Sequence, residues 1–503
     1  MSFYVTTPIY YVNAAPHLGH AYTTIAADVM ARHHRQRGEE VFFLTGTDEH
    51  GEPVADAAHA LGVEPQELAD KNAERFRALA PQLSASNDFF IRTTDPQHEA
   101  KVQEVLGRVR EGGYVYEGTY EGWYCPRCAD FKADNEIEEG TRCPIHHIEL
   151  TREQEQNYFF ALSAFQERLE ALYGEHERFV LPATRRNEAL AFIRSGLRDV
   201  PLTRHRLRWG VRVPWDDEHV FYVWFDALLN YYSALSYARD QDLTARLWPP
   251  SYHLIGKDIL RFHAVYWPAL LMAAELELPD HIFVHGFLLM DGEKMSKSLG
   301  NVLDPFAVIE RFGADALRFY LFREVPFGQD GSVSAASFEL RYETELANEL
   351  GNLASRTIAM LLRYRGGEVS SGALDESLTG DFSGLVDSVS ELIDGAELTL
   401  ALDEIWRRVR RLNRYVEERA PWVLARDPGN AQELDCVLRT LVEGLRSVAV
   451  LLWPFLPGSS ERLLAALGAS ELALAGAALG AGQIARVQAL ESLFPKDTQA
   501  ASA

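Results

Sequence analysis

The first fifty residues alternate between strand-like and helix-like patterns, and this alternation constrains the fold more than any other feature of the 503-residue chain. Residues 3–7 are typical of a short buried strand, and a turn-rich loop follows them. From Leu18 apolar residues recur at helical spacing until Gly38 ends the pattern. Residues 41–45 form the next strand-like run. A strand, a helix and a strand in this order predict a parallel α/β sheet.

Changes in composition further along the chain indicate additional domains. From Gly113 to about Leu181, turns, aromatic residues and clustered cysteines suggest a small inserted module. Strand-like segments then return, so we expect the sheet to resume; they are residues 220–224, 252–255 and 282–287. From about Phe338 the chain is typical of helices, with a linker at 366–382. The long amphipathic segments are 344–364, 383–415 and 431–454.

The net charge of −24 argues against a general nucleic-acid coat protein, which would be basic, but not against a local basic face for one RNA. Three of the four cysteines lie within 19 residues of one another, unlike a disulfide framework. Together with the lack of a signal peptide, this predicts a reducing cytoplasm. The fourth, Cys436, is interpreted as a buried small residue. No apolar run reaches the ~18 residues of a membrane helix.

The sequence His17-Leu18-Gly19-His20 lies where a loop enters the first helix. A helix N-terminus presents unpaired backbone N–H groups to a phosphate, and glycine allows close approach. Two histidines there can donate hydrogen bonds to phosphate oxygens. Taken alone, the four residues could equally be a chance occurrence or a packed histidine pair.

The sequence Lys294-Met295-Ser296-Lys297-Ser298 lies in a polar, glycine-flanked loop after the strand that ends at Phe287. Two lysines on such a loop can clamp a polyphosphate and neutralise a leaving pyrophosphate. The simpler interpretation is a solvated charged loop. No Walker-type phosphate loop competes with this site.

Three cysteines and a histidine form two closely spaced pairs in the inserted module. The spacing is C-x2-C, fourteen intervening residues, then C-x2-H. Two such pairs can supply four ligands to a tetrahedral Zn²⁺, and a full set of protein ligands indicates a structural site. We therefore expect one structural Zn²⁺ per chain, bound by Cys125, Cys128, Cys143 and His146. His147 is an alternative fourth ligand, and unconnected thiols are the alternative to a metal site.

In this order, the two phosphate-type motifs resemble the signatures of the class I aminoacyl-tRNA synthetases, HIGH and KMSKS. Other segments resemble the methionyl-tRNA synthetases within that class, and the similarity runs from residue 3 to about residue 460. These segments are 6–17, 46–51, 222–227, 255–259, 349–353 and 420–422. The insert of roughly 70 residues is smaller than the editing domain of the isoleucyl, valyl and leucyl enzymes. Cysteinyl enzymes hold zinc at the amino-acid site instead.

The resemblance implies a methionine pocket in which Asp48 pairs with the α-ammonium group. It also implies that the Tyr231 hydroxyl and a backbone N–H near Ile9 face the thioether sulfur. These polar contacts to the sulfur would exclude leucine. Size alone separates leucine from methionine by only ~1–3 kcal/mol. The remaining implied wall residues are Tyr11, Trp224, Ala227, Ile259 and His263. Without the resemblance, all of these residues would be interpreted as ordinary core.

The implied reaction has two steps and needs no covalent enzyme intermediate. The methionine carboxylate attacks the α-phosphate of ATP, and the adenylate then acylates the terminal ribose of elongator or initiator tRNA(Met). Mg²⁺ accompanies ATP. The implied catalytic residues are His17, His20, Lys294 and Lys297, and Gly19 and Ser296 complete the implied ATP site.

The helical region is implied to bind the tRNA anticodon through Asn352, Arg356 and Trp422. An exposed tryptophan can stack on a splayed base. A basic run in the same region is either part of this surface or a solvated helix face. It comprises Arg407, Arg408, Arg410, Arg411 and Arg414.

The expected architecture is a Rossmann-type parallel-sheet catalytic domain with an inserted zinc-binding module, followed by an α-helical bundle. The expected boundaries are 1–112 and 182–290 for the two catalytic halves, 113–181 for the insertion, 291–340 for the KMSKS loop and stem-contact region, 341–490 for the helical domain and 491–503 for a flexible tail. Without a C-terminal dimerisation domain, we expect a monomer with no stable protein partner.

Departures from the family pattern are a Cys3His ligand set, where many relatives have four cysteines, and Tyr10, where some have proline. Two other functions remain open: a different class I synthetase or related nucleotidyltransferase, and a non-catalytic RNA-binding protein with a zinc knuckle. Amino-acid-dependent pyrophosphate exchange distinguishes all three.

Overall fold

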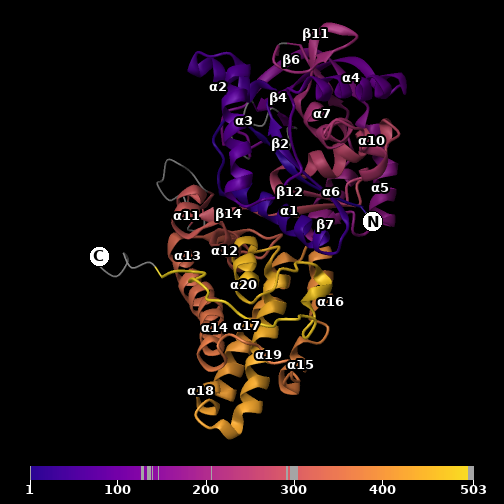
Figure 1. Ribbon diagram of the computed structural model, residues 1–503. Helices are drawn as coiled ribbons and strands as arrows, with labels where there is room; N and C mark the ends of the chain where they lie inside the picture. Colours follow the sequence, from indigo (N-terminus) through magenta and orange to yellow (C-terminus); the bar gives the residue numbers. More distant parts are fainter. Residues whose placement is uncertain are drawn as a thin grey trace.

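The computed structural model describes residues 2–125, 130–132, 137–138, 140–144, 147–205, 207–290, 293–294 and 304–496. A parallel sheet, an inserted antiparallel module and a long helical region follow one another in an elongated molecule (Figure 1). Within the described ranges, no helix has the length and apolar character needed to cross a membrane.

The central sheet has six strands in the order β3-β2-β1-β12-β13-β7, and every neighbouring pair is parallel. This confirms the predicted parallel sheet. Strand order reverses between β1 and β12, where ligands bind in doubly wound α/β folds. The strands are β1 (Ser2–Tyr11), β2 (Glu40–Asp48), β3 (Phe89–Arg92), β7 (Val180–Leu181), β12 (Tyr252–Gly256) and β13 (His281–His285).

Both faces of this sheet are buried, as its nearly continuous apolar strands require. Phe3 and Val5 of β1 pack on one face in the same core as helix α1, whereas Tyr4 packs on the other face. The helices of this part are α1 (Leu18–Gln36), α2 (Glu52–Leu61), α3 (Pro65–Gln82), α4 (Pro96–Glu111), α5 (Gln166–Glu175), α6 (Ala183–Arg194), α7 (Val223–Leu228), α8 (Asn230–Ser233), α9 (Thr244–Leu247) and α10 (Trp267–Ala273).

The inserted module is a four-stranded antiparallel sheet in the order β5-β4-β6-β8. Strands β4 and β6 form a long ribbon, from the pair Val115–Phe160 to the pair Tyr124–Thr151. The strands are β4 (Val115–Cys125), β5 (Asp130–Lys132), β6 (Thr151–Phe160) and β8 (Val200–Pro201). Cys125, of the first cysteine pair, is the last residue of β4, at the end of the ribbon opposite the Val115–Phe160 pair.

The prediction of a sheet strand at residues 220–224 is wrong. Residues 220–221 end β11 (Asp216–Phe221), which belongs to a small antiparallel sheet with β9 (Thr203–Arg204) and β10 (Arg212–Val213). Val223 then begins helix α7, whose residues are all buried. A short apolar run that is buried on every side has no periodicity to distinguish a strand from a helix.

A compact connecting region joins the sheet to the helical domain. Its elements are β14 (Leu288–Met290), β15 (Glu293–Lys294), α11 (Pro305–Phe312), α12 (Ala314–Glu324), β16 (Gly331–Val333) and α13 (Ala335–Arg341). Strand β14 pairs with β15 in an antiparallel and with β16 in a parallel arrangement. The chain therefore passes this small sheet twice, before and after the segment that contains KMSKS.

The helical domain begins with a π-helical stretch at Tyr342–Gly351, which continues into α14 (Asn352–Arg365). The remaining helices are α15 (Glu376–Phe382), α16 (Leu385–Asp394), α17 (Leu398–Arg419), α18 (Pro421–Leu424), α19 (Ala431–Leu452) and α20 (Pro457–Ala466). The segment predicted as one helix, 383–415, is two helices, because the chain reverses at Ala396 with a φ of +58°. The predicted linker 366–382 contains α15.

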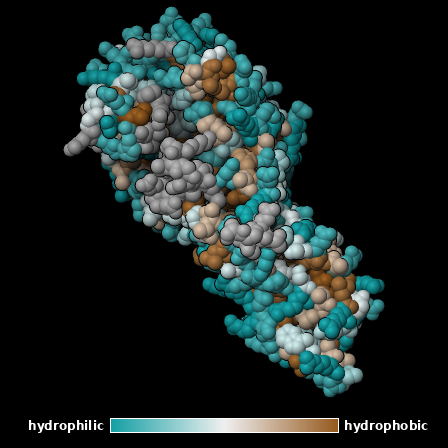
Figure 2. Space-filling model, turned by 90° about the vertical axis from the view of Figure 1, so that its left-hand side faces the viewer, coloured by the Kyte–Doolittle hydropathy of each residue, from teal (hydrophilic) through white to brown (hydrophobic). Residues whose placement is uncertain are grey.

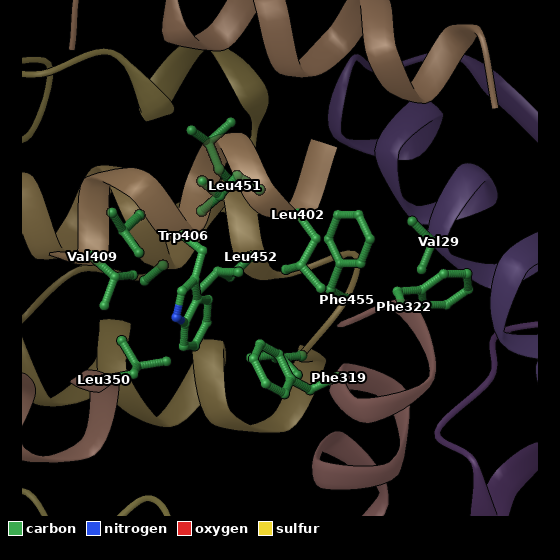
Figure 3. Close-up of a cluster of buried hydrophobic side chains, with 14 of the residues drawn as sticks. Val29, Phe319, Phe322, Leu350, Leu402, Trp406, Val409, Leu451, Leu452 and Phe455 are labelled. Carbon is green, nitrogen blue, oxygen red and sulfur yellow. The ribbon is translucent and has the colours of Figure 1, made fainter. Parts of the chain in front are cut away.

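The core of the helical domain surrounds Trp406, which is fully buried and packs against Phe319 of α12 at 4.5 Å between ring centroids. Figure 3 shows this cluster continuing through Phe455 and Phe322 towards Val29 of α1. A single apolar core therefore joins the helical domain to the first helix of the parallel-sheet domain. In the view of Figure 2 the outer surface is mainly hydrophilic, with apolar patches between polar regions.

The chain after α20 is not a helical tail. Residues 467–496 form an extended segment that lies across the helical domain, with one short turn at Leu474–Ala477. The backbone N–H of Val369 donates to the Ala485 carbonyl at 2.9 Å. Phe494 is buried against Tyr342. The tail predicted to be flexible from residue 491 is therefore packed at Phe494, and residues 497–503 lie outside the described ranges.

Candidate active site

A cavity of about 460 Å³ lies at the carboxyl ends of strands β1, β2, β12 and β13. All eight residues of the predicted methionine pocket line it, and so do three residues of the HLGH motif. These residues are Ile9, Tyr11, Asp48, Trp224, Ala227, Tyr231, Ile259 and His263, together with His17, Gly19 and His20. The fold thus brings together side chains from five separate segments at the reversal of strand order.

The HLGH motif forms the N-terminal cap of α1. His17 Nδ1 accepts the Gly19 N–H at 3.1 Å, and His20 Nδ1 accepts the His17 N–H at 3.0 Å. Because Nδ1 accepts in both rings, the proton of each neutral imidazole is on Nε2. A Cβ atom on Gly19 would lie 2.9 Å from His17 Cε1, so a larger residue there would displace the His17 ring. The motif presents two N–H donors of fixed tautomer at the cavity.

His20 is held by aromatic neighbours. Its ring lies 4.6 Å from that of Tyr10 and 5.1 Å from that of Phe76, centroid to centroid. Burial, together with the neighbouring His17, lowers the pKa of His20 well below its ordinary value. The ring is therefore neutral near pH 7 and acts as a hydrogen-bond donor rather than as a cation. Tyr10, where some relatives have proline, also supports the site, because its hydroxyl bonds to Thr24 at 2.9 Å.

Asp48 ends strand β2 and is 2% exposed. Within the described part of the chain, its Oδ1 atom is buried and has no hydrogen-bond partner. Burial, and then the charges of Asp226 and Glu49, raise the pKa of Asp48 well above its ordinary value. A buried carboxylate oxygen that lines a cavity and lacks a partner is an acceptor for a cationic or N–H-bearing ligand.

Aromatic rings form one wall of the cavity. Trp224 and Phe262 stack with centroids 3.7 Å apart and an interplanar angle of 8°, and Tyr11 meets Trp224 edge-on at 6.2 Å. Among the described residues, no atom accepts a hydrogen bond from Trp224 Nε1. This wall suits an apolar, polarisable side chain.

Tyr231, His263 and Ile259 form a hydrogen-bonded chain in the same wall. His263 Nδ1 donates to the Ile259 carbonyl at 3.2 Å, because a carbonyl oxygen can only accept. Burial lowers the pKa of His263 to about 4, so the ring is neutral and its Nε2 accepts the Tyr231 hydroxyl proton at 2.8 Å. In the ligand-free site the Tyr231 hydroxyl proton thus points to His263.

Eleven further lining residues were not predicted, and five of them lie at or just after the carboxyl ends of β12 and β13: Gly256, Asp258, His285, Phe287 and Leu288. The rule that ligands bind at those ends could have identified these five. His285, at the end of β13, also contacts helix α1. Its Nε2 accepts the Thr23 hydroxyl proton at 2.7 Å, while its Nδ1 donates to the Gly286 carbonyl at 2.8 Å.

The backbone of Lys294 is paired with Leu289 in the hairpin of β14 and β15. Leu288, one residue before Leu289, lines the cavity. The start of the KMSKS motif is thus connected to the cavity wall by one short strand. Ser296 and Lys297 lie outside the described residues.

Cys125 and Cys143 are both fully buried in one small cluster with Leu150 at the end of the β4–β6 ribbon. The Cys143 N–H donates to the Ile148 carbonyl at 2.9 Å, and the Cys143 carbonyl accepts the His147 N–H at 2.8 Å. His147 is exposed and pairs with Glu138 at 2.9 Å. Cys128 and His146 lie outside the described residues. The two described thiols come from the two predicted ligand pairs and belong to the same buried cluster.

The three predicted anticodon residues are found near one end of the helical domain. Asn352 and Arg356 are one turn apart on α14, and Arg356 Nη1 pairs with Glu417 of α17 at 2.6 Å. Trp422 follows five residues later, in α18, and is half-buried against the core. Figure 1 places α18 at the end of the molecule farthest from the parallel sheet.

The basic run on α17 is largely neutralised. Arg407 and Arg408 both pair with Glu404, Arg410 pairs with Glu349 and Arg411 with Asp381. The interpretation as a solvated helix face therefore fits these four arginines better than that of an RNA-binding stripe.

Comparison with known proteins agrees with this geometry. The family profile described as "tRNA synthetases class I (M)" matches residues 3–156 and 141–358. The fold and the site therefore define a class I aminoacyl-tRNA synthetase. The chain belongs to the methionyl-tRNA synthetase (methionine–tRNA ligase) family of that class.

The relatives and solved structures cover nearly the whole chain. It is 43% identical to the methionine–tRNA ligase of Caldanaerobacter subterraneus over 98% of its length and 79% of that protein, and 46% identical to that of Streptomyces coelicolor over 93% and 90%. The structure of Mycobacterium tuberculosis methionyl-tRNA synthetase in complex with methionyl-adenylate superposes with a TM-score of 0.94 at 42% identity, over 98% of this chain and 100% of that chain.

Proposed function

We propose that the chain activates L-methionine with ATP and transfers it to tRNA(Met) in the cytoplasm. The observation that carries the proposal is the joint position of Asp48, the aromatic wall and the HLGH cap around one cavity. A cationic group, an apolar chain and a polyphosphate are three of the chemical parts of methionine and ATP. Each part has a matching group in the cavity.

In the first step, Asp48 would accept hydrogen bonds from the α-ammonium group of methionine. The stacked Trp224 and the Tyr231–His263 pair would enclose the thioether side chain, and the backbone near Ile9 would contact the sulfur. To meet the sulfur, the Tyr231 hydroxyl would have to turn its proton away from His263 Nε2. Tyr11, Ala227 and Ile259 would complete the walls of the pocket.

ATP would bind with its phosphates at the N-terminus of α1. The Nε2–H groups of His17 and His20 can donate to phosphate oxygens, and Gly19 leaves room for them. Lys294, Ser296 and Lys297 would also contact the phosphates, and the lysines would neutralise charge as pyrophosphate leaves. Mg²⁺, as generally required with ATP, would supply additional charge neutralisation.

ATP–pyrophosphate exchange tests this function without tRNA. We expect exchange with methionine and not with the other nineteen amino acids. Exchange with isoleucine or cysteine instead would reassign the substrate, and no exchange with any amino acid would favour a binding protein. Lys297→Ala should lower kcat far more than it raises the KM for methionine, because a charge aimed at the departing phosphates acts mainly in the transition state.

We also propose that the inserted module holds one structural Zn²⁺ through Cys125, Cys128, Cys143 and His146. The proposal is supported by the burial of Cys125 and Cys143 in one cluster at the end of the ribbon. Thiolates are the preferred ligands of zinc, and four protein ligands would leave no open position for catalysis.

For the helical domain, we propose that Asn352, Arg356 and Trp422 read the anticodon. Support comes from their shared location at the end remote from the cavity. Base recognition by Arg356 would compete with its ion pair to Glu417, whose 61% exposed side chain can move aside at little cost.

A further inference from the structure

Three chain segments meet where β13 leaves the parallel sheet. The first contains Gly286 and Phe287, the second begins at Lys257 after β12, and the third surrounds Asp330 before β16. A Cβ atom on Gly286 would lie 2.3 Å from the carbonyl carbon of Gln329, so the first and third segments touch through their backbones. The Gly331 N–H also donates to the Phe287 carbonyl at 3.0 Å.

The carboxylate of Asp330 is the polar centre of this junction. Its Oδ1 accepts the Phe287 N–H at 2.8 Å, and its Oδ2 pairs with Lys257 Nζ at 2.6 Å. The same ammonium lies 4.4 Å from the centroid of the Phe287 ring. One side chain from the connecting region thus contacts both segments just beyond the last paired residues of β12 and β13, Gly256 and His285.

Both segments contribute to the cavity wall. Phe287 and Leu288 line it after β13, and Gly256 and Asp258, which flank Lys257, line it at the end of β12. Leu288 continues into the hairpin that reaches Lys294. A shift at Asp330 would therefore alter the position of the KMSKS segment relative to the end of β12.

We propose that Asp330 is a positioning residue for adenylate formation, which sets the distance between the segment leading to KMSKS and the loop after β12. The inference rests on the proposed function, because it assigns Asp330 to that same reaction. Asp330 does not line the cavity and is not assigned to substrate contact. Its effect would pass through Phe287 and Lys257.

Thermal melting distinguishes this positioning role from a purely structural role, in which the variants would lose folding stability and turnover together. The side chains of Lys257 and Asp330 are 24% and 39% exposed, and ion pairs at such sites contribute little to folding stability. Loss of the pair should therefore leave the melting temperature nearly unchanged. Misplacement of a catalytic segment by a fraction of an ångström, in contrast, reduces turnover strongly.

The test compares Asp330→Ala and Asp330→Asn with wild type by methionine-dependent pyrophosphate exchange and thermal melting. For Asp330→Ala we expect kcat to fall by roughly 10-fold with the KM for methionine within about twofold of wild type. Asp330→Asn keeps an oxygen for the Phe287 N–H and loses the ion pair, so we expect an intermediate kcat.

Glu104→Ala is the matched control, because Lys101 and Glu104 also pair at 2.6 Å with a lysine side chain that is 24% exposed. It should change neither kcat nor the melting temperature. Normal kcat in Asp330→Ala, or a fall in kcat that is matched by unfolding in both Asp330 variants, would overturn the inference. Wild type without methionine-dependent exchange would refute the proposed function instead.

Discussion

At the scale of single residues, the buried carboxyl group of Asp48 favours ligand binding but lowers the stability of the folded, ligand-free protein. The folded protein raises the pKa of this carboxyl above its value in the unfolded chain. Ionisation of Asp48 therefore costs folding stability as the pH rises through the folded-state pKa, and a bound ammonium group would offset that cost. The Asp48 carboxylate, which destabilises the folded protein when the site is empty, is the group proposed to bind the ammonium group of methionine.

Asp48→Asn should consequently raise the melting temperature of the ligand-free protein by about 1–2 °C at pH 8 and by less at pH 5. It should also raise the Kd for methionine by at least about 30-fold, because it removes the charge partner of a buried ammonium group. Calorimetry with methionine and melting curves at the two pH values measure both effects. Unchanged methionine affinity would exclude Asp48 as the ammonium partner.

Cavity-lining residues could be predicted from sequence where a family motif contains them, as for Asp48 and Trp224. Asp258 and Asp330 could not, because their positions depend on which strand ends meet in space. The ion pair between Arg410 and Glu349 could not be predicted from sequence either, since the two residues are 61 positions apart and belong to different helices.

At the scale of elements, the alternation of strand and helix predicted the sheet well because its period is regular over many residues. It failed at residues 220–224 and at the break near Ala396. Burial on all sides removes periodicity in the first case, and a single left-handed residue reverses the chain in the second. Both failures are local, and neither changes the order of the sheet.

The ribbon of β4 and β6 should depend on its metal. Cys143→Ser should lower the zinc content to well below one ion per chain and lower the melting temperature of the module, because metal binding stabilises small modules with few buried apolar residues. Methionine activation should be retained better than tRNA charging. Elemental analysis, melting curves and the two activity assays check these expectations.

Cys436→Ser is the control for this experiment, since Cys436 lies on α19 and outside the inserted module. It should keep one zinc per chain. A stable wild-type protein that is purified without metal would contradict the zinc assignment, whatever its activity.

At the scale of the whole molecule, helix α1 connects the cavity to the helical domain. Its first turn carries the HLGH cap, and near its end Gln36 donates hydrogen bonds to the carbonyls of Val450 and Leu472 in the helical domain. Between them, the buried Asp28 pairs with Arg318 at 2.7 Å, and Arg318 donates to the Phe455 carbonyl at 2.8 Å. The helical domain therefore has a fixed orientation relative to the cavity.

Trp422→Ala should impair tRNA charging and leave methionine activation nearly unchanged, because Trp422 lies at the end remote from the cavity. Loss of one stacked base, worth ~1–3 kcal/mol, should lower kcat/KM for tRNA by roughly one to two powers of ten. Aminoacylation, pyrophosphate exchange and melting temperature are measured on the same variant.

Val423→Ala is the matched control, because Val423 is the next residue of α18 and is 50% exposed. It should charge tRNA within about threefold of wild type. Since Trp422 is half-buried, its replacement could instead weaken the core; an equal loss of activation and charging, with a lower melting temperature, would reject the anticodon role.

The extended segment at residues 467–496 affects the order in which parts of the protein fold during synthesis. Its buried residues, such as Val487 and Phe494, complete a core whose other parts are synthesised much earlier. Domains fold from the N-terminus as the chain emerges from the ribosome, so the parallel sheet can form while the helical domain still exposes this apolar surface. The parallel sheet and the cavity at its strand ends can thus form before the helical domain is closed, and synthesis of residues 467–496 would complete the core of that domain.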